Sequence, residues 1–381
     1  MHSHILQQFH DLFPGKAPVL VRAPGRFNLI GEHTDYNLGW VLPGAIDKCL
    51  WLALAPADRC DIQALDTGER QAFHPGEPAA PGSPGWTAYF TAVVQELRER
   101  GHPVGAFCGV FGGDIPVGAG LSSSAALCCG LIGALAVLFQ FPVERREIAR
   151  IAQAAEHRIG LNCGPMDQYA VLFGKKDRLI LLDCQALDFQ YVPLHTGDYA
   201  LVLLHSGVHH ALAAGSGYND RRASCERVVG FLQKENPALK SLRDLSPTLL
   251  QSRRAELDPV DYRRAAYVLA ENERVLRIAA ALNDGNLIEL GRLLYEAHDG
   301  LRYAYEVTVP EIDLLVDLAR AETAVLGARM VGGGFGGCTL NLVHRAEKTA
   351  VVERISAAYF EKTGLRPQPI EVAASEGLQV F

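Results

Sequence analysis

The chain has 381 residues, of which 49% are hydrophobic and 21% charged, and its formal net charge at pH 7 is -7. This length exceeds one ordinary hydrophobic core, so we expect two packed lobes or one large α/β domain. The composition excludes a disordered or fibrous chain. The acidic balance argues against a general nucleic-acid binder, which needs clustered Lys and Arg.

Cysteine usage and the first residues indicate a cytoplasmic protein. None of the nine cysteines forms a CxxC pair, and Cys128 and Cys129 lie in an apolar run that suits neither a zinc site nor a disulfide. We interpret the cysteines as buried, reduced thiols. Residues 1–6 lack the basic region and apolar stretch of a secretory signal.

The first part of the chain alternates expected strands and helices. Residues 75–85 are rich in Pro and Gly and predict a surface loop. Apolar residues at helical spacing, Tyr89, Val93 and Leu97, predict the helix that follows. The expected strands are 19–21, 40–43, 50–54 and 106–111, and the expected helices are 86–98, 122–138 and 144–158.

The stretch from Ile115 to Phe141 has no charged residue and is long enough to span a bilayer. Its first part is glycine-rich and polar, which does not suit a segment that faces lipid. We therefore expect a buried helix entered through a tight loop, and no membrane partner.

The second half opens with short strands around Asp183 and in the 190s, followed by a strand at 199–204. We place the lobe boundary near 190, which gives an N-terminal lobe of residues 1–190 and a C-terminal lobe of residues 191–381. The remaining expected helices are 220–235, 259–283, 286–297, 309–326 and 346–363, and the remaining strands are 328–331, 338–343 and 369–372.

A glycine- and serine-rich segment at 118–126 opens the apolar helix. Glycines let the backbone approach an anion, and the free N–H groups and dipole of a helix N-terminus attract phosphate. This loop is a candidate cradle for nucleotide phosphates, and a plain serine N-cap is the alternative. A Gly-x4-Gly-Lys-Ser/Thr P-loop does not occur in the chain.

A second glycine cluster, residues 332–337, matches the dinucleotide pattern GxGxxG. The cluster comes late in the chain and precedes a strand instead of a helix, which is the wrong context for that fingerprint. We expect a flexible glycine turn that packs against another site.

Residues 25–37 place many hydrogen-bonding side chains in one loop between apolar strands. Recognition of vicinal sugar hydroxyls needs such carboxylate, imidazole and amide groups at fixed positions. A metal site formed by Glu32, His33 and Asp35 and a merely solvated loop are equally compatible with this pattern.

The segment 163–169 follows Glu156 and contains Gly164 and Pro165, which fix a bend. The bend presents Asp167 where a helix or turn begins. Taken alone, this position favours a solvated Asp that serves as an N-cap.

Together and in this order, the four features resemble galactokinases of the GHMP kinase superfamily. Residues 25–37 are similar to the galactokinase signature almost letter for letter, and the segments 118–126 and 332–337 are similar to the superfamily's second and third motifs. The likeness extends from about residue 19 to residue 343. It implies the α/β fold of GHMP kinases, an α+β arrangement of two lobes in which helices pack on mixed sheets. The active site would lie in the cleft between the lobes.

The resemblance also implies ATP-dependent phosphorylation of the anomeric hydroxyl of galactose, the first committed step of galactose catabolism, with Mg²⁺ as the metal. Arg26 and Asp167 would flank the attacking hydroxyl, and Ser124 and Glu156 would hold Mg²⁺. The sugar would contact Glu32, His33, Thr34, Asp35, Gly164, Asp167 and Tyr218. ATP would contact Gly118, Ala119, Gly120, Leu121, Ser122, Ser123, Ser124 and Trp86.

Three other functions share parts of this pattern. An N-acetylgalactosamine kinase or an arabinose kinase would keep the phosphate loops, and a galactose and ATP sensor would bind without catalysis. The complete serine loop and the presence of both Arg26 and Asp167 favour an active enzyme. We expect a monomer or a weak homo-oligomer whose partners are the small molecules galactose and ATP.

Overall fold

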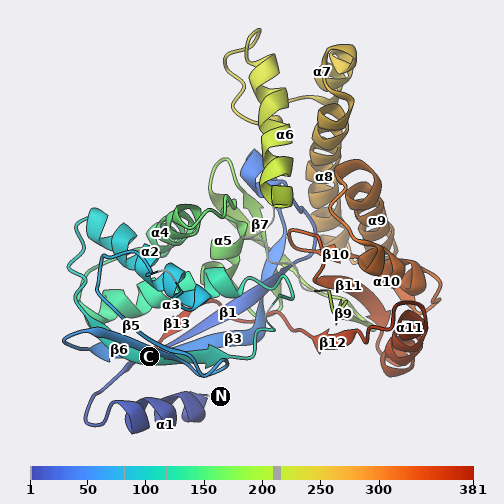
Figure 1. The fold of residues 1–381 in the computed structure, drawn as a ribbon. Coiled ribbons are helices and arrows are strands. Elements are labelled where there is room, and N and C mark those ends of the chain that lie inside the picture. The colour runs from blue at the N-terminus through green and yellow to red at the C-terminus, as the bar shows by residue number, and fades with distance from the viewer. Residues whose placement is uncertain (1, 81, 117, 209–215) are drawn as a thin grey trace.

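The computed structural model describes residues 2–80, 82–116, 118–208 and 216–381, and Figure 1 shows helices packed on mixed sheets. The predicted α/β class is therefore confirmed. The largest sheet has the strand order β13-β1-β3-β6-β4-β5, in which only β4 and β6 pair in parallel among the described residues. Its strands are β13 (Gln379–Val380), β1 (Val19–Asn28), β3 (Pro43–Pro56), β6 (Phe107–Gly113), β4 (Cys60–Ala64) and β5 (Arg70–Phe73).

Helices cover both faces of this sheet (Figure 1). On one face lies α1 (His2–Leu12), whose buried Ile5 and Phe9 pack against β1, β3 and β6. The other face carries the apolar helix α3, which brings Cys128 and Cys129 into the main core. The helices on that face are α2 (Gly85–Glu99), α3 (Ser123–Leu138), α4 (Arg145–Arg158) and α5 (Met166–Phe173).

A small antiparallel sheet and a second lobe follow. The small sheet has the order β2-β7-β8, formed by β2 (Trp40–Val41), β7 (Arg178–Asp183) and β8 (Asp188–Pro193). The sheet of the second lobe is antiparallel with the order β10-β11-β9-β12. Its strands are β10 (Val325–Val331), β11 (Cys338–His344), β9 (Tyr199–His205) and β12 (Gln368–Glu371), and its helices are α9 (Leu287–Gly300), α10 (Pro310–Arg320) and α11 (Lys348–Thr363).

A helical projection extends away from the sheets (Figure 1). It consists of α6 (Ser216–Leu232), α7 (Pro247–Ser252) and α8 (Pro259–Asn283), and a separate apolar core that includes Val228 and Val268 holds it together. A π-helical turn, η5 (Leu301–Tyr305), contributes Tyr305 to the same core. The remaining short turns are η1 (Asp35–Asn37), η3 (Leu242–Asp244) and η4 (Arg254–Glu256).

Most predicted elements exist, but several boundaries are wrong. The strand expected at 19–21 continues to Asn28 in β1, and the strand expected at 50–54 is the second part of β3, which begins at Pro43. The helix expected at 309–326 ends at Arg320 in α10, and Val325 already belongs to β10, opposite Val343 of β11. Apolar residues continue through this junction, so helical spacing alone does not reveal the turn, whereas pairing with β11 decides it.

The chain end returns to the first lobe, because Val380 of β13 pairs with Val21 of β1. One apolar core also includes residues on both sides of position 190, among them Leu182 and Leu203. The division of the chain near 190 stays a prediction, and residues 379–380 belong to the first sheet whatever boundary is chosen.

The cysteines are free thiols and most are buried, as the sequence predicts. All nine cysteines lie in the described ranges and none is paired in a disulfide; eight are buried, and Cys163 is half-buried.

Candidate active site

Two glycine loops meet backbone to backbone. Gly120 has φ +72°, and a Cβ there would lie 3.3 Å from the carbonyl oxygen of Val331. A Cβ on Gly332 would in turn lie 3.3 Å from the carbonyl oxygen of Gly120. This close approach explains why both segments are glycine-rich. The second cluster therefore packs against another site, as predicted, and β11 follows it where a dinucleotide fold would have a helix.

A carboxylate, a guanidinium and a hydroxyl converge beside these loops. Arg26 on β1 donates from Nε to Asp167 Oδ1 at 2.7 Å and from Nη2 to Oδ2 at 2.9 Å, and its Nη1 donates to the Gly120 carbonyl. Ser122 donates its hydroxyl to Asp167 Oδ2. The bidentate pair fixes the orientation of the carboxylate relative to the loop.

The alternative interpretation of Ser122 as a plain N-cap is wrong, because its side chain makes no capping hydrogen bond to α3. Instead Ser122 adopts a left-handed backbone, φ 57° and ψ 48°, which turns the hydroxyl towards Asp167. Such a conformation is strained for a residue with a Cβ and is frequent at functional sites.

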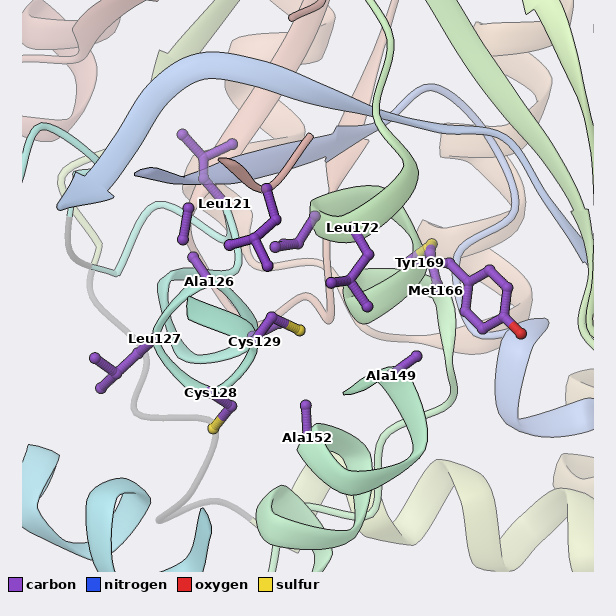
Figure 2. Close-up of a cluster of buried hydrophobic side chains, with 14 of the residues drawn as sticks. Leu121, Ala126, Leu127, Cys128, Cys129, Ala149, Ala152, Met166, Tyr169 and Leu172 are labelled. Carbon is purple, nitrogen blue, oxygen red and sulfur yellow. The ribbon is translucent and has the colours of Figure 1, made fainter. Parts of the chain in front are cut away.

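Helix packing fixes Asp167. The residue lies in the first turn of α5, and its neighbours Met166 and Tyr169 are buried. Figure 2 shows Leu121, Cys128 and Cys129, from the glycine loop and α3, facing side chains of α4 and α5. The same apolar cluster therefore holds the loop that carries Ser122 and the helix that carries Asp167.

Five of the seven predicted sugar residues line a cavity of about 60 Å³, and Thr34 and Gly164 do not. The cavity also borders the Arg26–Asp167 pair and the first glycines of the turn at 332–337. Its lining is Arg26, Glu32, His33, Asp35, Leu161, Cys163, Met166, Asp167, Tyr218, Gly332 and Gly333. Gly333 also lines a second hollow of about 60 Å³ between the two glycine loops, so this residue borders both spaces.

His33 is buried, and its Nδ1 lies 2.8 Å from the Tyr36 hydroxyl, which lies 2.8 Å from the Tyr305 hydroxyl. Burial, and then the nearby Arg221, lower the pKa of His33 to about 3. The imidazole is therefore neutral at physiological pH and offers one donor and one acceptor. The ring of Tyr218 lies 5.5 Å from that of His33.

Asp35 and Gly164 approach closely, since a Cβ on Gly164 would lie 2.3 Å from Asp35 Oδ2. Only glycine fits there, which gives Gly164 a role in seating the carboxylate. Burial, and then the charge of Asp167, raise the pKa of Asp35 to about 7. Such a perturbed carboxyl group in a cavity is typical of functional sites.

We expect Asp35→Asn to stabilise the ligand-free protein at neutral pH. The folded-state pKa of Asp35 is about 7 against an ordinary value of 3.8. The folded protein therefore keeps a proton that the unfolded chain loses, so the stability contributed by this group is lost as pH rises from about 4 to about 7. The asparagine variant has no such group to titrate, so its free energy of unfolding should exceed that of the wild type by at most about 4 kcal/mol. Melting temperatures of both proteins at pH 5 and pH 7.5 measure the effect, and an equal difference at both pH values would contradict it.

Glu32 and Thr34 are placed differently from the other sugar-loop residues. Both carboxylate oxygens of Glu32 already accept protein hydrogen bonds, although the residue borders the cavity. Thr34 is fully buried, and its hydroxyl lies 2.8 Å from the Gly31 carbonyl and 2.7 Å from that of Trp40. Thr34 holds the loop together, and its contact with substrate stays a prediction.

Ser124 and Glu156 come together although 32 positions separate them in the chain. Burial raises the pKa of Glu156 to about 7, a hydrogen bond from Ser124 opposes that rise, and the charge of Asp167 adds to it. Gln168 also donates to the carboxylate. Among the described residues, no group of three or more His, Cys, Asp or Glu side chains could hold a metal ion.

Trp86 lies at the start of α2 and borders a mainly apolar cavity of about 220 Å³. Its indole stands edge-on to Phe90 and Phe111, and its Nε1 donates to Glu69 at 3.1 Å. The same cavity is lined by Ser123 and Ser124 of the phosphate loop, so three of the eight predicted ATP residues share this space. Gly118 and Gly120 line a different hollow, between the two glycine loops.

Arg329 is the residue that sequence reasoning missed. It lies in β10, is fully buried, and contacts Glu32 through Nη2 at 2.5 Å. A charged residue in the middle of an otherwise apolar strand, next to the glycine turn, was the available signal.

Three family profiles match the chain: the galactokinase galactose-binding signature at residues 7–56, the GHMP kinases N terminal domain at residues 88–175, and the GHMP kinases C terminal domain at residues 278–362. A galactokinase from Thermotoga maritima is 38% identical over 360 residues, with 94% of this chain and 99% of the relative covered. A galactokinase from Glaesserella parasuis serovar 5 is 38% identical over 382 residues, with 98% and 97% covered.

Solved structures agree. The galactokinase of Lactococcus lactis, crystallised with galactose, superposes with a TM-score of 0.93 at 30% identity, covering 99% of both chains. The mevalonate kinase of Methanococcus jannaschii, at 16% identity and a TM-score of 0.64, shares the fold over 95% of this chain and all of its own. Within the described residues, every helix is too short or too polar to cross a membrane.

Proposed function

The chain belongs to the galactokinase family of GHMP kinases, and from that premise we propose that the protein transfers the γ-phosphoryl group of ATP to the anomeric hydroxyl of galactose. The products are galactose 1-phosphate and ADP. The observation that carries the proposal is the Asp167 carboxylate, held by Arg26 and Ser122 where the sugar cavity meets the glycine loops.

In this mechanism the protein mainly positions and stabilises charge, because phosphoryl transfer needs an in-line nucleophile and neutralisation of the γ-phosphate. Asp167 accepts a hydrogen bond from the attacking hydroxyl and orients it, and it takes the proton as the bond to phosphorus forms. Arg26 fixes Asp167 and presents positive charge to the transferred group. The backbone N–H groups around Gly118 and Gly120 would bind phosphate oxygens.

Ser124 and Glu156 fit a Mg²⁺ site. Mg²⁺ prefers oxygen ligands and keeps several waters, so one hydroxyl and one carboxylate beside phosphate oxygens suffice. The fit rests on the buried Glu156 carboxylate, which is 2% exposed and has no cationic partner among its described contacts. When bound there, Mg²⁺ would neutralise phosphate charge.

We expect Trp86→Ala to weaken ATP binding selectively, because the substitution removes the indole from the lining of the apolar cavity that Ser123 and Ser124 also line. Loss of a buried aromatic contact predicts a rise in the ATP KM of about 10-fold or more, with the galactose KM nearly unchanged. Steady-state kinetics with each substrate varied in turn measure this. Trp51→Ala is the matched control, since Trp51 packs with His2 and Phe381 outside the cleft. Equal changes in both KM values would contradict the assignment.

ADP release from Mg-ATP tests the function itself. The purified protein is assayed without sugar and with galactose, glucose, N-acetylgalactosamine or arabinose. The proposal expects turnover with galactose well above the other reactions. Turnover with another sugar would keep the kinase and change its substrate, and tight binding of galactose and ATP without turnover would indicate a sensor.

A further inference from the structure

The sugar loop, residues 25–37, belongs to the first lobe in sequence but is held by elements of the second half of the chain. Arg329 of β10 donates from Nε to the Leu29 carbonyl at 2.8 Å and from Nη2 to the Asn28 carbonyl at 2.7 Å. From α8, Glu271 accepts the N–H of Gly31 at 3.0 Å. Neither Arg329 nor Glu271 lines the cavity, so the loop that carries the predicted sugar residues is held by groups outside it.

The hydrogen bonds of Glu32 leave little acceptor capacity. Its Oε2 accepts from Asn28 Nδ2 at 2.7 Å and from Arg329 Nη2 at 2.5 Å, and its Oε1 accepts from the N–H of Gly332 at 3.0 Å. A carboxylate offers about four lone-pair sites, two on each oxygen. One site on Oε1 remains for a sugar hydroxyl, on a residue that borders the cavity.

The buried ion pair of Arg329 and Glu32 is not the arrangement that would stabilise the fold most. Arg329 and Glu32 are 0% and 1% exposed, and Nη1 of Arg329 has no hydrogen-bond partner among the described residues. A buried ion pair generally contributes no more than well-packed apolar residues of the same volume, because desolvation offsets the attraction. Positioning of Glu32 explains the costly pair better than stabilisation does.

We propose that Arg329 is a positioning residue for galactose binding, which acts by orienting Glu32 so that the free site on Oε1 accepts one sugar hydroxyl. The inference rests on the proposed function of the cavity. Gly332, whose N–H donates to Oε1 of Glu32, is the first residue of the glycine turn that packs on the phosphate loop. Arg329 thus acts on the sugar through Glu32 and does not contact the reacting atoms.

Arg329→Lys keeps the charge but loses the planar fork that reaches two carbonyls and Glu32 at once. The measurements are the galactose Kd by calorimetry without ATP, the kinetic constants and the melting temperature. We expect the galactose Kd and KM to rise about 10-fold, with the ATP KM changed less than about 2-fold. Ile5→Ala in the separate core under α1, which contains no residue of β10, is the control for stability alone, and its galactose Kd should stay at the wild-type value. A galactose Kd unchanged in folded Arg329→Lys would overturn the proposal.

A double-mutant cycle tests the route through Glu32. Glu32→Gln should itself weaken galactose binding, and adding Arg329→Lys should then cost little more. Independent, additive losses would overturn the proposal. If Arg329→Lys does not fold, the double variant Glu32→Gln with Arg329→Met takes its place. It removes both charges of the buried ion pair, so neither is left without a partner. It should match Glu32→Gln in galactose affinity, and a further loss would count against the proposal. Failure of the wild-type protein to bind galactose would refute the proposed function first, and this inference with it.

Discussion

Asp167→Asn should lower kcat by about 10²- to 10⁴-fold, the usual contribution of a positioned acid or base, while the protein stays folded. The amide is nearly isosteric, and its oxygen can still accept from Arg26 or Ser122, which both donate to the carboxylate. The buried guanidinium of Arg26 loses its counter-charge, so the melting temperature should fall although the fold persists. The variant loses the negative charge that accepts the proton of the attacking hydroxyl. Galactose and ATP KM values should change much less than kcat.

Turnover measured under saturating substrates, together with the melting temperature, checks this result. Asp188→Asn is the matched control, because that side chain is 73% exposed and forms a surface ion pair with Arg146. Its kcat should equal that of the wild type. A folded Asp167→Asn enzyme with wild-type turnover would remove Asp167 from the mechanism.

Arg26→Lys should lower kcat by about 10²-fold or more, similar to the loss of one preorganised donor in other enzymes. The guanidinium contacts both oxygens of Asp167 and the carbonyl of Gly120 at the same time. An ammonium group cannot reproduce this planar geometry, although it keeps the charge. Lysine is the informative replacement, since removal of the buried charge would leave Asp167 unpaired and cost about 3–5 kcal/mol of stability.

Steady-state kinetics and thermal unfolding of Arg26→Lys provide the test. Arg22→Lys on the same strand is the control, because Arg22 donates to the Glu376 carbonyl and to Ser375, near the chain end. That variant should keep wild-type kcat. If both lysine variants behave alike, the Arg26–Asp167 pair is structural and another group supplies the charge.

The sequence by itself determined the family, the α/β class and most of the elements. Local signals explain this success: glycines beside a helix start, strands of apolar residues, and the signature at 25–37 depend on neighbouring residues. A local signal also placed Asp167 at a helix start, whereas the assignment of Trp86 to ATP came from the family resemblance. Both residues border cavities that contain other predicted site residues.

Only the tertiary structure decided what each side chain does inside the site. Ser122 belongs to the phosphate loop by sequence, yet its hydroxyl binds Asp167. Glu32 belongs to the sugar loop, yet Arg329, almost 300 positions later in the chain, takes part of its acceptor capacity. These pairings join residues that are distant in sequence, so no local pattern or periodicity records them. They arise because packing of β1, α5 and β10 brings buried charges together, and a buried charge must find a partner.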